Sequence, residues 1–144
     1  MKGATVEIEG VGQVNAFLRK YGKEAEDAIA KDVVATALEI NTAVKKRIQR
    51  GAKTGRVYVR GNVTHQASAP GESPATDTGT LASSVYFEQS NKLTATIGSR
   101  LAYAYYLEYS TTRIAARPAW IPETEIGQKK LNARVEKTMK RLSK

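Results

Sequence analysis

The chain has 144 residues, of which 41% are hydrophobic, so a single core can form without help from metals or disulfides. It has no cysteine, which excludes a disulfide framework, a thiolate nucleophile and a cysteine-based zinc site, and no stretch approaches the roughly 20 apolar residues that span a bilayer, so no membrane partner is expected. Lys and Arg number 23 and Asp and Glu 14, and the formal net charge of +9 makes nucleic acid and acidic protein surfaces candidate partners.

The first third of the chain predicts an edge strand and then a long helix. Apolar residues alternate with glutamates over 6–9, which favours a short strand. A short apolar helical face over 14–21 is followed by Gly22, where we expect a break. A second helix over about 23–49, roughly 40 Å long at ~1.5 Å per residue, should end at Gly51. Its apolar residues recur at steps of three and four: Ala25, Ala28, Ile29, Val33, Ala37, Ile40, Val44 and Ile48.

The middle of the chain predicts a hairpin and an irregular connection. β-prone runs over 56–60 and 63–66 are separated by Gly61-Asn62, a two-residue turn signal. Most of these positions are polar, so we expect the hairpin to project as an arm over about 52–68. Residues 68–76 hold two prolines and show no apolar periodicity, which is typical of a loop.

The last part predicts short elements and a closing helix. Asp77, Thr78 and Gly79 can cap a turn of helix that contains Leu81. The elements that follow are strands over 85–89 and 93–98, an aromatic helix over 103–109, an extended linker over 117–122, and a terminal helix that starts at Pro122 with Leu131, Val135, Met139 and Leu142 on one face.

The residue inventory argues against an enzyme. The one histidine, His65, lies in the predicted hairpin with no nucleophile-elbow sequence near it. Four carboxylates are scattered singly between strands and loops, unlike a metal or glycosidase motif: Glu72, Asp77, Glu88 and Glu108. There is no phosphate-binding Gly-Lys-Ser/Thr loop. We therefore expect a binding or structural protein with no cofactor and no metal.

Tyrosines gather in the predicted aromatic helix, at positions 103, 105, 106 and 109. They could stack on bases, as in proteins that bind single strands. At helical spacing, Tyr105, Tyr106 and Tyr109 more often pack against a core or a neighbouring subunit.

Two arginines follow the tyrosines. Arg113 and Arg117 could hold a carboxylate such as Glu108 in a bidentate contact, or could be solvated charges of a loop. Both interpretations stay open.

The positive charge is concentrated in two places, residues 40–71 and the C-terminal tract from Lys129 to Lys144. Residues 40–71 carry seven basic groups and no acidic one. The 40–71 segment could bind phosphate, although a solvated helix end and arm is the default interpretation of such a charge run. A basic nucleic-acid-binding protein is therefore the alternative function.

The order of these elements resembles a known family. The motifs are "APGESPATDTGTLASSV" at 69–85, a strand pair, and "YAYYLEYSTTRIAARPAWIPETE" at 103–125, between a long helix and a closing helix. Over residues 5–142 the chain resembles the tail-component family of long-tailed double-stranded DNA bacteriophages, the neck or tail-completion proteins found where head joins tail.

The resemblance implies an α+β fold of one domain, residues 1–144, with a small, mostly antiparallel sheet and the long helix packed on one face. It implies a structural virion protein, made in the host cytoplasm, that forms a ring of typically six copies at the head–tail junction. Its partners would be other copies, neighbouring neck proteins, the tail terminator or tail tube and the head-side connector, with genomic DNA passing through the lumen without sequence-specific binding. Tail completion, tail termination and head closure stay open.

A ring subunit needs elements that reach its neighbours. Arg56, Tyr58 and Arg60 occupy alternate positions of one strand, so they should share a face. The predicted subunit or ring interface consists of Arg56, Tyr58, Arg60, Tyr105, Glu108, Tyr109, Arg113, Arg117, Pro118 and Trp120.

Overall fold

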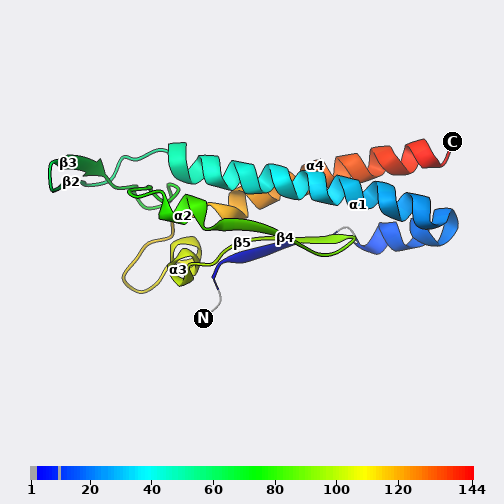
Figure 1. The fold of residues 1–144 in the computed structure, drawn as a ribbon, viewed down its shortest axis with the longest axis horizontal. Helices are drawn as coiled ribbons and strands as arrows, with labels where there is room; N and C mark the ends of the chain where they lie inside the picture. Colours follow the sequence, from blue (N-terminus) through cyan, green and yellow to red (C-terminus); the bar gives the residue numbers. More distant parts are fainter. Residues whose placement is uncertain (1–2, 10) are drawn as a thin grey trace.

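The computed structural model describes residues 3–9 and 11–144. Its elements are, in chain order, β1 (Thr5–Glu9), α1 (Val11–Arg50), β2 (Val57–Arg60), β3 (Val63–Gln66), α2 (Thr80–Ser83), β4 (Val85–Asn91), β5 (Thr94–Ser99), α3 (Ala102–Tyr109) and α4 (Trp120–Leu142). The predicted α+β class is confirmed, with a three-stranded antiparallel sheet in the order β1-β5-β4, a separate hairpin of β2 and β3, and two long helices (Figure 1).

The long helix α1 contains the predicted break at Gly22. This residue has φ 68° and ψ −150°, a conformation that glycine adopts without the steric cost other residues incur. Figure 1 shows the chain turning back on itself within α1, and the non-helical backbone at Gly22 divides α1 into two helical segments. The predicted apolar stripe faces the core: Ala25, Ile29, Val33, Ala37, Ile40, Val44 and Ile48 are all buried.

Helix α4 packs antiparallel along the longer segment of α1. Near its start, Glu123 accepts a hydrogen bond from the Arg47 guanidinium at 2.9 Å, and near its end the Thr138 hydroxyl donates to Asp32 at 2.6 Å. Within the described residues, no helix combines the length and apolar character needed to cross a bilayer.

The two helices approach closely at Gly127. A Cβ atom there would clash with Cδ1 of Ile40, so a larger residue would require the Ile40 side chain to move or the helices to separate. Helix α4 begins at Trp120, two residues before Pro122, so the predicted extended linker over 117–122 is shorter than expected.

The three-stranded sheet lies against these helices as a second layer (Figure 1). Its central strand β5 carries Ile97, which is fully buried and pairs with Val6 on one side and Phe87 on the other. Strands β4 and β5 contact α1, and β1 contacts both α1 and α4. The predicted edge strand and strand pair are therefore present, with ends shifted by one or two residues.

The hairpin of β2 and β3 projects from the end of the molecule as an arm (Figure 1). Its turn is the predicted Gly61-Asn62, with φ 63° at the glycine. The arm exposes its large apolar side chains: Val57 is 54% exposed, Val59 70% and Val63 56%.

Candidate functional site

The predicted interface residues divide into two groups in the structure. Those that lie at the surface are Arg56, Tyr58, Arg60, Tyr105, Tyr109 and Arg113. Those that are buried or half-buried are Glu108, Arg117, Pro118 and Trp120. The side chains of the second group make contacts within the chain that position the surface elements.

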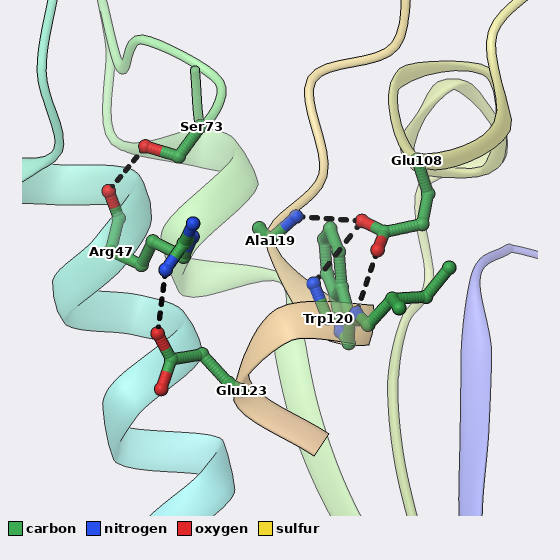
Figure 2. Close-up of polar contacts among 7 residues, drawn as sticks. Arg47, Ser73, Glu108, Ala119, Trp120 and Glu123 are labelled. Atoms are coloured by element: carbon green, nitrogen blue, oxygen red, sulfur yellow. Dashed lines mark hydrogen bonds and ion pairs between the residues drawn. The ribbon is translucent and has the colours of Figure 1, made fainter. Parts of the chain in front are cut away.

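Glu108 has a buried carboxylate that binds the backbone at the start of α4. It is 3% exposed and accepts hydrogen bonds from the backbone N–H groups of Ala119 at 2.8 Å, Trp120 at 3.1 Å and Ile121 at 2.7 Å (Figure 2). Free N–H groups and the positive end of the helix dipole both favour a carboxylate at this position. Glu108 therefore fixes α3 to the first turn of α4.

The two nearby arginines bind elsewhere. Arg117 donates from Nε and Nη2 to the carbonyl oxygen of Ser68, at 3.3 and 3.2 Å. Arg113 is exposed, and its backbone N–H donates to the hydroxyl of Thr111. Of the two interpretations left open for these arginines, the bidentate contact with Glu108 is not observed, because backbone N–H groups bind the carboxylate.

The end of α1 lies beside the contact between α3 and α4 (Figure 2). The Ser73 hydroxyl donates to the carbonyl oxygen of Arg47 at 2.7 Å, and the Arg47 guanidinium pairs with Glu123 (Figure 2). Trp120 is fully buried beside these contacts. The junction joins α1, the 68–76 connection, α3 and α4, and it positions the arm that leaves α1.

Asp77 ties the arm to the body. Its carboxylate accepts a hydrogen bond from Arg60 Nη1 at 2.8 Å and faces His65 Nδ1 at 3.0 Å. The His65 ring stacks on Tyr58, with centroids 5.7 Å apart. Tyr58, Arg60 and His65 thus share one face of the hairpin, and that face looks toward Asp77.

The predicted cap of α2 differs in detail from the observed one. Gly79 is the N-cap residue, and no side chain caps the helix. The Thr78 hydroxyl instead shares a hydrogen bond with the Thr80 hydroxyl, and the Asp77 carboxylate is engaged by the arm. The assignment of Asp77 and Thr78 as capping side chains is therefore wrong.

Glu72 holds the base of the arm, a role that the sequence reasoning missed. Its carboxylate accepts hydrogen bonds from the Thr54 hydroxyl at 2.6 Å, the Thr54 N–H at 2.9 Å and the Ala69 N–H at 2.7 Å. The hydrogen bonds from Thr54, followed by the one from Ala69, hold the pKa of Glu72 below its ordinary value of 4.5. The Pro-rich sequence around Glu72 offers only a turn signal, which does not identify these donors.

Helix α3 presents an aromatic surface. Tyr103, Tyr105 and Tyr109 are 46%, 46% and 47% exposed, and the rings of Tyr105 and Tyr109 lie 4.9 Å apart. Ile114, in the loop that follows, is 41% exposed. These three tyrosines lie at the surface and do not enter the chain's own core.

Across residues 3–9 and 11–144, no group of three or more histidine or carboxylate side chains could hold a metal ion. The candidate site consists of a projecting arm, an exposed tyrosine surface and the junction that positions both.

Comparison with known proteins gives one family. The model described as "Bacteriophage HK97-gp10, putative tail-component" matches residues 12–109, which is more than half of the chain. Neither a curated protein nor a solved structure matches the chain significantly.

Proposed function

The chain belongs to the HK97 gp10-like family of bacteriophage tail components, and on that premise we propose that it forms a ring at the phage neck that completes the tail and joins it to the head. The family is a structural one and not an enzyme family, and a tail component is located in the virion. Our proposal concerns what goes beyond family membership: the ring, its typical six copies and its level in the neck.

The observation that carries the proposal is the projecting arm. Three valines that are more than half exposed lie on a two-stranded hairpin outside the body of the chain. Such a hairpin is marginal by itself, and exposed apolar side chains favour contact with a partner. An arm that contacts a different patch on the next copy makes a head-to-tail interface, and such interfaces form a ring when the rotation between copies closes.

The tyrosine surface of α3 supplies a second contact. Tyrosine and arginine are enriched in protein interfaces, and the surface holds Tyr105, Tyr109 and Arg113. We expect it to meet another copy or the adjoining ring, such as the tail terminator, tail tube or head-side connector. Genomic DNA would pass through the lumen.

The proposal is tested in the phage that encodes the chain, with its own copy removed and variants supplied in trans. Val57→Ser with Val59→Ser removes the apolar face of the arm, so free heads and free tails should accumulate in electron micrographs. The matched control is Leu38→Ser with Ile126→Ser, because these residues are 48% and 50% exposed on the helices. Normal joining by the arm variant, or equal loss in the control, would contradict the proposal.

A further inference from the structure

Four cations follow one another along the chain from the last turns of α1 to the start of the arm: Lys46, Arg50, Lys53 and Arg56. We call these four residues the basic strip. Lys46, Arg50 and Arg56 are exposed and Lys53 is half-buried. Among the described residues, none of the four has an ion pair.

The carboxylates that lie at this end of the molecule are already engaged. Glu123 pairs with Arg47, Asp77 binds Arg60 and His65, and both oxygens of Glu72 accept hydrogen bonds. Among the described residues, the positive charge of the basic strip is therefore left without an acidic partner, which suits a polyanion.

The backbone that carries the strip is held in place. Thr54 binds Glu72 through its hydroxyl and N–H, and the Gly55 N–H donates to the carbonyl oxygen of Ala67 at 2.9 Å. Lys46 and Arg50 are one helical turn apart, ~6 Å along the axis, and the six residues from Arg50 to Arg56 reach at most ~20 Å. Cations spread over this length can meet several phosphates of one DNA strand, where charges recur regularly.

The residues between the cations favour DNA over a protein partner. Gly51, Ala52 and Gly55 are small and offer no aromatic or large apolar side chain for the centre of a protein interface. Lysine is depleted in such interfaces, whereas lysine and arginine dominate contacts with phosphates. We propose that the basic strip binds the phosphate backbone of duplex DNA without reading its sequence. This binding does not require the ring.

The test is fluorescence anisotropy with a labelled 30-base-pair duplex across a range of salt concentrations. If all four cations contact phosphates, log K should fall with log[salt] with a slope of about −3.6. Replacing the strip by glutamine (Lys46→Gln, Arg50→Gln, Lys53→Gln, Arg56→Gln) should bring the slope close to zero, because each lost contact lowers it by about one, and should weaken binding at least ~10-fold at low salt.

The matched control removes the same charge from α4 and the C-terminal residue: Lys129→Gln, Lys137→Gln, Arg141→Gln and Lys144→Gln, four exposed cations with no ion pair among the described residues. It should keep the slope and bind within ~3-fold of the unmodified chain. Circular dichroism checks that both variants are folded. Equal weakening in the two variants, no binding by the unmodified chain, or strong preference for one of two unrelated duplexes would overturn the proposal.

Discussion

The three-stranded sheet and the arm are built from similar sequences but have opposite environments. Both are antiparallel and rich in β-branched residues, yet Ile97 and Val85 of the sheet are 0% and 3% exposed, whereas Val57 and Val59 of the arm are 54% and 70% exposed. The sheet has a third strand and a helical layer over one face, and the arm has neither. Alternation of apolar and polar residues thus predicts a strand, but the neighbouring elements decide whether the apolar face of that strand is buried and contributes to stability.

The largest expected difference lies between matched truncations in these two regions. Ile97→Ala removes a fully buried side chain from the central strand and should lower the free energy of unfolding by about 2–5 kcal/mol. Val59→Ala, in the arm, should change it by less than about 0.5 kcal/mol. Urea denaturation measures both. Comparable losses would mean that the arm packs into the core in solution.

The elements that could be predicted from the sequence are those marked by a regular spacing of apolar residues or by a glycine at a turn or break. The apolar stripe of α1 identified its buried face, Gly22 identified the break, and Gly61-Asn62 identified the hairpin turn. These signals are local: they depend on helical spacing or on the conformations that glycine allows. The structure that such a signal predicts does not depend on which element, distant in the sequence, packs against it.

The contacts of the junction could not be predicted in this way. Glu108 binds backbone N–H groups, which every residue except proline carries, so its partners have no residue-type signature. Arginines nearby in sequence suggested a charge pair instead. Asp77 likewise suits a helix cap by type, but the folded hairpin brings Arg60 and His65 to it.

The second prediction tests the buried carboxylate of the body. Glu108→Gln replaces the carboxylate by an amide. The amide oxygen can still accept hydrogen bonds from the backbone N–H groups, but the amide NH2 group is itself a donor and cannot accept them. We expect a loss of about 1–3 kcal/mol in the free energy of unfolding, the cost of leaving buried N–H groups unpaired. The control is Glu88→Gln, the same chemical change at an exposed position of β4, which should be nearly neutral. A neutral Glu108→Gln would mean that the hydrogen bonds from these N–H groups to the carboxylate do not contribute to stability.

The third prediction concerns acid and the base of the arm. Because the folded pKa of Glu72 is lowered, its carboxylate stabilises the fold above pH 4.5, and this contribution is lost as pH falls through the folded pKa, below 4.5. The amide proton shifts of Thr54 and Ala69 should therefore titrate together, with a midpoint below 4.5. Glu72→Gln should remove this titration. A midpoint at or above 4.5 would mean that these hydrogen bonds are absent in solution.

The smallest expected effect on stability comes from Asp77, the exposed counterpart of Glu108. Its partner Arg60 has a side chain that is 71% exposed, and pairs of this kind contribute about 0–1 kcal/mol. Asp77→Asn should therefore leave the unfolding midpoint almost unchanged. It should nevertheless release the arm, because Asp77 holds both Arg60 and His65.

That release is measured by hydrogen exchange, which reports local opening separately from global unfolding. In Asp77→Asn, the ladder amides of β2 and β3 should exchange faster, while those of β4 and β5 keep their rates. The control is Asp27→Asn, which breaks an exposed pair with Lys92 in the body and should not affect the arm. Unchanged exchange in the arm would mean that the hairpin is held by its base at Glu72, and not by Asp77.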